Sequence, residues 1–143
     1  MKAGRTLLLV AAWLSFLLAV LHVGMIAVGA PAYRYFGAGE LMVRLAEQGS
    51  WFPSVVTAGA TVLFTLAGAY ALSAAGRLPR MAFVRLALVC IVAVYTLRGL
   101  FLFAQLAEPT PTRELVFSAV SLSVGLVYAA ALTVVWSRIP LEP

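Results

Sequence analysis

The hydrophobic positions of this chain fall into four long runs, which short polar segments separate. The runs cover residues of about 7–30, 53–76, 82–105 and 115–136. A hydrocarbon core of about 30 Å is crossed by roughly 20 apolar residues at about 1.5 Å of helix rise each, and every run reaches that length. The pattern therefore predicts four membrane-spanning helices.

A shorter segment of about 40–48, between the first and second runs, alternates with a helical period. Leu41, Met42 and Leu45 fall on one side, and the polar residues Glu40, Arg44, Glu47 and Gln48 fall around the other. This pattern predicts a short amphipathic helix that lies in the membrane interface. Glu40 and Arg44 stand four residues apart, so we expect an exposed ion pair between them. In the alternative, the helix closes the mouth of the bundle and presents Glu40 or Arg34 to its interior.

Composition agrees with a membrane protein. Hydrophobic residues make up 64% of the 143 residues and charged residues only 10%, whereas a water-soluble domain carries about 25% charged residues. The loops are too short for a soluble module. We therefore predict an all-α fold, an integral membrane four-helix bundle that forms one transmembrane domain over 1–143. The first run is too long for the 7–15 apolar residues of a signal peptide, so we expect a retained helix.

Basic residues are distributed unequally between the two sets of loops and chain ends. Arg34, Arg44 and Arg113 share one side with four glutamates, and the other side holds Lys2, Arg5, Arg77, Arg80, Arg85 and Arg138 with Glu142 as its acid. By the positive-inside rule, both termini are expected in the cytoplasm. One lysine against nine arginines, with no aspartate or asparagine, is typical of a GC-rich bacterial source, so we predict the bacterial inner membrane. The sequence has no basic patch interleaved with exposed aromatic residues, so it does not indicate nucleic-acid binding.

Each predicted span carries polar or small residues on one helical face. We expect the four faces to meet in a partly polar interior. At about 1.5 Å per residue, His22, Thr61, Arg98 and Ser121 lie roughly 9–12 Å from the outer helix ends and are expected to share one layer. The faces are Ser15, His22, Gly29 and Tyr33; Thr57, Thr61, Thr65 and Gly68; Ile91, Tyr95, Arg98, Leu102 and Gln105; and Glu114, Ser118, Ser121, Gly125 and Tyr128.

Arg98 is the strongest functional signal in the sequence. An arginine near the middle of a span costs about 2.5–3.5 kcal/mol on insertion scales, so it normally faces protein or water and finds a partner. Its acid partners are limited to glutamates of the outer side, or to an anion outside the protein. The predicted ligand-binding residues are Arg98, His22, Tyr95, Thr61, Ser121 and Glu40. In the alternative, this layer is structural: Arg98 reaches the headgroups, and His22 and the threonines bond to backbone carbonyls.

Counting residues excludes several chemistries. One histidine and one cysteine, Cys90, form neither an intrachain disulfide nor a bis-histidine haem nor an ordinary zinc site of cysteine and histidine. We therefore expect no cofactor and no metal. The chain contains no phosphate-binding loop and no dinucleotide fingerprint. Catalytic residues are not identifiable.

Three hypotheses of function remain. The first is a binding or accessory protein with an outer-facing polar pocket for an anionic or lipid-like ligand, in which Glu40 closes the mouth. The second is a membrane enzyme acting on a lipid or quinone, with Glu40 or His22 as acid or base and Arg98 as an electrostatic clamp. In the third, the chain is a subunit or immunity-type partner of another membrane protein and has no ligand of its own. We rank catalysis below binding.

The expected partners follow from these hypotheses. They are membrane lipids, an anionic or lipophilic small molecule, and a second copy of the chain or another membrane protein. If the amphipathic helix closes a pocket over Arg98, Glu40→Ala and Arg98→Ala should be non-additive by more than about 0.5 kcal/mol.

Overall fold

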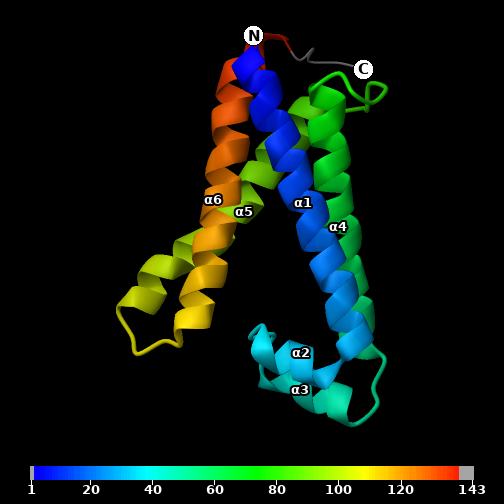
Figure 1. Cartoon of the computed structure of the whole chain (residues 1–143), viewed down its shortest axis with the longest axis vertical. Coiled ribbons are helices and arrows are strands. Elements are labelled where there is room, and N and C mark those ends of the chain that lie inside the picture. The colour runs from blue at the N-terminus through cyan, green and yellow to red at the C-terminus, as the bar shows by residue number, and fades with distance from the viewer. Residues whose placement is uncertain (1, 139–143) are drawn as a thin grey trace. The chain divides into compact units, whose positions relative to one another are not determined.

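The computed structural model describes residues 2–138, and this part of the chain is all-helical (Figure 1). Four of its helices are long and apolar enough to cross a membrane, which is compatible with a membrane helical bundle. Glu142, counted above among the inner charges, lies outside the described residues. The long helices are α1 (Lys2–Val28), α4 (Phe52–Ala74), α5 (Val84–Leu106) and α6 (Thr112–Val135); the shorter elements are α2 (Ala30–Tyr35), α3 (Glu40–Glu47) and the 3-10 turn η1 (Trp136–Arg138).

Helix boundaries agree with the hydrophobic runs to within a few residues, and the main difference lies at Gly29. The first run was expected to stay helical to residue 30, but α1 ends at Val28 and α2 begins at Ala30. Gly29 separates the two helices with φ 79° and ψ −141°, a conformation that only glycine adopts at low cost. Pro31 follows in the first turn of α2, where its missing N–H leaves no helical hydrogen bond unmade.

Residues 15–65 form one compact unit, in which α2 and α3 pack together. Met25, Ala32, Tyr33 and Val43 make its buried cluster. The expected helix at 40–48 is present as α3, but its buried side differs from the predicted one. Val43 is 2% exposed and Leu41 is 61% exposed, because the contacts with α2 select the face of α3 that turns inward. The position of α3 at a membrane interface stays a prediction.

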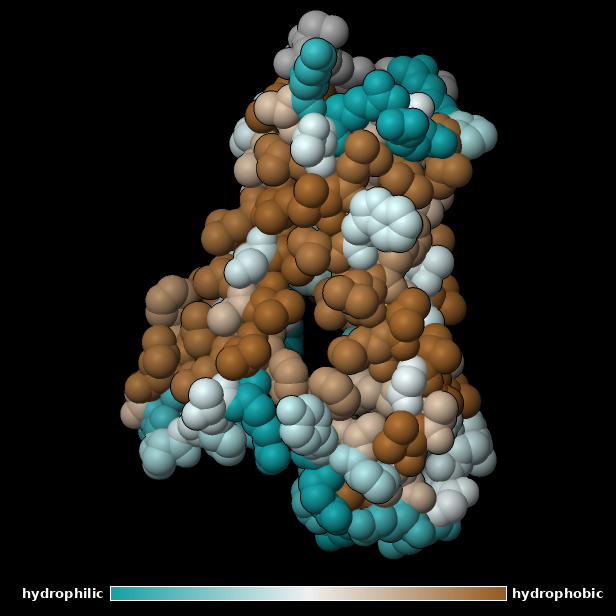
Figure 2. Space-filling view, viewed as in Figure 1, coloured by the Kyte–Doolittle hydropathy of each residue, from teal (hydrophilic) through white to brown (hydrophobic). Residues whose placement is uncertain are grey.

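Residues 2–14 and 66–138 belong to a second compact unit. Within it α5 and α6 run side by side and are joined by the short loop after Leu106 (Figure 1). Hydrophobic surface covers the middle of these helices, and hydrophilic residues gather at their ends (Figure 2). Only 17% of the apolar stretch of α5 is buried inside the protein. Most of that helix is therefore open to lipid or to a partner.

Candidate functional site

Two glycines bring α5 and α6 into close contact. A Cβ atom added at Gly99 would lie 2.5 Å from both the backbone nitrogen and the Cα of Leu122. On the facing helix, a Cβ at Gly125 would lie 2.8 Å from Oγ1 and 3.0 Å from the backbone nitrogen of Thr96. Small residues allow helix backbones to approach in this way inside a membrane. The close approach places the polar faces of the two helices against each other.

At this contact three side chains form a hydrogen-bonded chain. Arg98 Nη1 donates to Ser118 Oγ over 3.0 Å, and Ser118 Oγ donates to Gln105 Oε1 over 2.7 Å. Ser118 is completely buried, Gln105 is half-buried and Arg98 is exposed. Arg98 and Gln105 are seven residues apart on α5, about 10.5 Å along the helix axis. Their side chains therefore converge on Ser118 from its two sides.

The arginine fixes the direction of both hydrogen bonds among Arg98, Ser118 and Gln105. A guanidinium has five N–H donors and no acceptor, so Ser118 must accept from Arg98. The single hydroxyl proton of Ser118 then goes to Gln105, whose contacting atom must be the carbonyl oxygen. The amide nitrogen of Gln105 keeps its two N–H donors, and Arg98 keeps four N–H donors beyond the one given to Ser118. The cluster presents positive charge and free donors, and each of its two acceptor oxygens already accepts one hydrogen bond.

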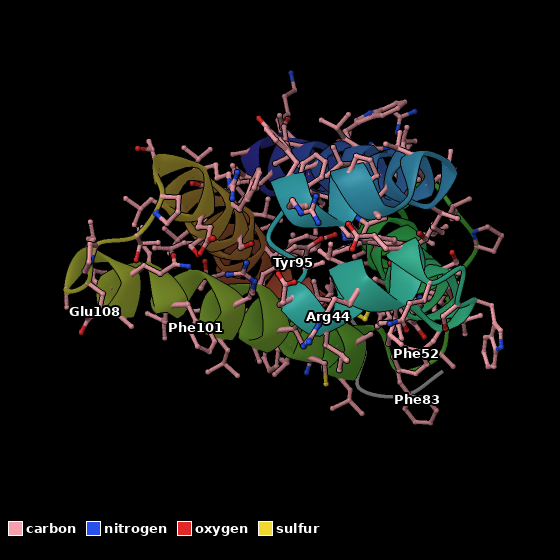
Figure 3. The ribbon with its side chains drawn as sticks, turned by 90° about the horizontal axis from the view of Figure 1, so that it is seen from below. Arg44, Phe52, Phe83, Tyr95, Phe101 and Glu108 are labelled. Carbon is pink, nitrogen blue, oxygen red and sulfur yellow. The ribbon has the colours of Figure 1, made fainter. Side chains whose placement is uncertain are left out.

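Tyr95 on α5 and Tyr128 on α6 stack against each other where the two helices meet. Both rings are buried, with centroids 5.8 Å apart and planes inclined by 16°. The Tyr128 hydroxyl donates over 3.0 Å to the backbone oxygen of Ala67 on α4, so its hydroxyl joins helices instead of facing a ligand. Phe101, further along α5, is 61% exposed and projects to the outside (Figure 3). The polar side of α5 is therefore the side that faces α6.

Three other predicted ligand-binding residues bond to their own helices. His22 Nδ1 lies 2.7 Å from the backbone oxygen of Leu18, and its ring centroid lies 4.7 Å from that of Phe64. Thr61 donates to the oxygen of Thr57 over 2.9 Å, and Ser121 donates to the oxygen of Phe117 over 3.0 Å. These are the contacts expected if the layer is structural. His22 and Thr61 belong to residues 15–65, whereas Arg98 and Ser121 belong to the other unit; their common layer stays a prediction.

The charged residues around α3 pair differently from the prediction. Among the described residues, the salt bridge of this segment joins Arg34 Nη2 to Glu47 Oε1 at 2.6 Å, and the expected pair of Glu40 with Arg44 is not formed. Glu40 is exposed in the first turn of α3. The pairing follows from the contact of α2 with α3, which brings Arg34 to Glu47 across thirteen residues. Local spacing on one helix could not reveal it.

Ser118 and Gln105 belong to the observed cluster but were not among the predicted ligand-binding residues, although both were assigned to polar helix faces. A signal was available for both. Gln105 follows Arg98 by seven residues, two helical turns along the same face. Ser118 follows Glu114 by four residues on the face of the next helix. What the spacing did not indicate was the register between the helices, which Gly99 and Gly125 determine.

The four apolar helices define a multi-pass membrane protein of the helical class. Within residues 66–138 its most developed polar feature is the cluster of Arg98, Gln105 and Ser118, which we call the Arg98 cluster. Comparisons with protein-family models, with curated proteins and with solved structures found no match.

Proposed function

We propose that the chain is a membrane binding protein whose Arg98 cluster holds the anionic group of a lipid-like ligand. One observation carries the proposal: Arg98, inside a membrane-spanning helix, has a neutral hydroxyl as its hydrogen-bond partner. From Arg98 to the end of α5 at Leu106 is about 12 Å at about 1.5 Å per residue. A guanidinium at that depth favours a counter-charge, since an unpaired charge within a span is expensive.

The protein itself supplies no such counter-charge among the described residues. Among the described residues no carboxylate lies within 4.0 Å of Arg98, Glu114 included, and the salt bridge found in residues 2–138 joins Arg34 to Glu47 in the other unit. Glu114 lies one helical turn before Ser118 and is half-buried. An anionic group with several oxygen acceptors matches the remaining donors of Arg98 and Gln105, because charge-assisted hydrogen bonds are the stronger kind.

A lipid-like ligand fits the surroundings of this cluster better than a free ion. Exposed apolar side chains of α5 flank Arg98, among them Leu97, Leu100 and Phe101. An amphiphile would place its polar group on the Arg98 cluster and its chain along this apolar surface. The proposal includes the orientation that the basic residues indicate, with both termini in the cytoplasm of a bacterial inner membrane and the loop after α5 on the outer side.

The test is native mass spectrometry of the protein released from mild detergent, with a substitution that fills the site from within. Gln105→Glu replaces the amide by a carboxylate, which can accept from Ser118 and neutralise Arg98. We expect this variant to lose a bound amphiphile that travels with the wild type, and to unfold no more easily. Arg98→Gln should lose the ligand too. The matched controls are Gln48→Glu, at the exposed residue directly after α3, and Arg113→Gln, in the exposed first turn of α6; both should keep the ligand.

The outcomes separate the proposal from its alternatives. Equal retention by Gln105→Glu and the wild type would mean that the Arg98 cluster does not hold the ligand. A wild type without any bound amphiphile, accompanied by a second membrane protein in every variant, would favour the subunit or immunity-type hypothesis. Chemical change of the retained amphiphile by the wild type alone would favour the enzyme.

A further inference from the structure

A second charged feature lies at the opposite end of the same unit from the α5–α6 loop. Its bases come from the start of α1, the loop between α4 and α5, and the first turn of α5. The acids described in this unit, Glu108 and Glu114, lie at the other end of α5 and α6. Figure 2 shows hydrophilic residues gathered at this end. We call it the basic end, and the bases there whose side chains the structure describes are Lys2, Arg5, Arg77, Arg80 and Arg85.

Arg85 is fixed in place at the basic end. Its Nη2 donates to the backbone oxygen of Trp136 over 2.7 Å, and its guanidinium carbon lies 4.9 Å from the centroid of the Trp136 ring. A cation over an aromatic face is attracted by the ring. Its buried Nε has no acceptor among the described residues. The arginine is therefore held in one orientation, but its hydrogen-bonding capacity is only partly used.

The first turn of α1 packs against the last turn of α6, which directly precedes the same tryptophan. A Cβ atom added at Gly4 would lie 2.6 Å from Cγ1 of Val134 and 3.0 Å from Cγ1 of Val135. Gly4 therefore packs directly on the last turn of α6, immediately before Trp136. Arg5, the next residue of α1, is exposed there. Three elements, α1, α5 and α6, thus bring two arginines to one helix end.

The surface around this helix end is amphipathic. Trp136 is 44% exposed and Val134 is 48% exposed, so apolar surface continues from the basic residues along α6. Tryptophan is enriched at the level of lipid headgroups because its ring is apolar and its N–H is polar. A soluble anion would use the charges only. An anionic phospholipid would use both the charges and the apolar surface.

We infer that the basic end carries a binding site for one anionic phospholipid, with its phosphate on Arg85 and Arg5 and an acyl chain along Val134 and Trp136. This site is separate from the Arg98 cluster and does not depend on the proposed function. It differs from the general attraction of basic loops to anionic membranes, because a fixed arginine predicts one bound lipid and a residue-specific loss.

The experiment measures which phospholipid stays on the protein in native mass spectrometry after incubation with equal amounts of phosphatidylglycerol and phosphatidylcholine. The wild type should keep one phosphatidylglycerol in preference to phosphatidylcholine. Arg85→Gln should lower that preference about fivefold. Arg77→Gln removes the same charge from the exposed α4–α5 loop and should change it much less.

Several results would overturn this inference. If the wild type shows no preference for phosphatidylglycerol, the inference is wrong. This result needs no variant, so it holds even if Arg85→Gln fails to fold. Equal losses in Arg85→Gln and Arg77→Gln would show diffuse attraction in place of a site. Glu142 lies outside the described residues. If phosphatidylglycerol binds only after Glu142→Gln, this carboxylate and not a lipid occupies the basic end in the wild type. Loss of preference in Arg98→Gln alone would assign the bound lipid to the Arg98 cluster instead.

Discussion

At the scale of single residues, Ser118 links the two helices that carry the candidate site. Its hydroxyl accepts from Arg98 and donates to Gln105 while the side chain is fully buried. Ser118→Ala removes both contacts and leaves the Gln105 oxygen without its donor, so we expect a loss of about 1–2 kcal/mol in unfolding free energy. Equilibrium unfolding in detergent measures this loss.

The control for Ser118→Ala is Ser123→Ala on the same helix. Ser123 is exposed and its hydroxyl bonds to the oxygen of Ala119 within α6, so the change should stay within about 0.5 kcal/mol. If both variants lost the same stability, the bonds of Ser118 to Arg98 and Gln105 would have no special weight. Ligand retention by Ser118→Ala should fall together with its stability.

Two buried tyrosines predict opposite effects of losing one hydroxyl. The Tyr33 hydroxyl is buried with no partner among the described residues, whereas the Tyr128 hydroxyl donates to Ala67. Tyr33→Phe should leave thermal stability unchanged or raise it, because an unpaired buried polar group is costly. Tyr128→Phe should lower the unfolding free energy by about 1 kcal/mol. A comparable loss in Tyr33→Phe would reveal a bound water or ligand on that hydroxyl.

At the scale of elements, the contact of α5 with α6 depends on Gly99. Gly99→Ala would place a Cβ 2.5 Å from the Leu122 backbone, so the helices must separate, and we expect a loss of about 1–3 kcal/mol in unfolding free energy. The separation should also move Ser118 away from Arg98 and weaken ligand retention in native mass spectrometry.

Gly59→Ala is the matched control for the α5–α6 contact. Gly59 lies inside α4 with no atom within 4 Å of an added Cβ, so alanine should stabilise by up to about 1 kcal/mol through its higher helix propensity. Equal destabilisation by the two substitutions would mean that Gly99 does not set the spacing of α5 and α6.

At the scale of the whole molecule, one prediction concerns the energetic coupling between Glu40 on α3 and Arg98 on α5. Glu40 lies on α3 in one unit and Arg98 on α5 in the other. If α3 closes over the Arg98 cluster, the effects of Glu40→Ala and Arg98→Ala on stability or ligand binding should be non-additive by more than about 0.5 kcal/mol. A double-mutant cycle measures this coupling, and additive effects would exclude closure by Glu40.

The sequence predicted most of the fold from hydropathy, because each span must satisfy its backbone hydrogen bonds internally and so becomes a helix. It predicted less of the candidate site. Tyr95 and Arg98 were predicted to share one face of α5, since helical period is a local property, and in the structure both contact α6. The counter-charge of Arg98 was expected to be a glutamate of the outer side or an anion outside the protein. Among the described residues its hydrogen-bond partner is Ser118, and the anion stays a prediction. The ion pair of Arg34 with Glu47 was likewise hidden from local spacing.

The sequence by itself determined the number of long apolar helices, their extent to within a few residues, and the apolar character of their surfaces. These depend on residues a few positions apart, whose relation is fixed by helix geometry. The tertiary structure alone decided that Gly29 interrupts the first helix, that Val43 is the buried side chain of α3, and that Arg98 and Gln105 meet at Ser118. These depend on how one helix is placed against another, because contact distances of a few ångströms select the partner of each side chain.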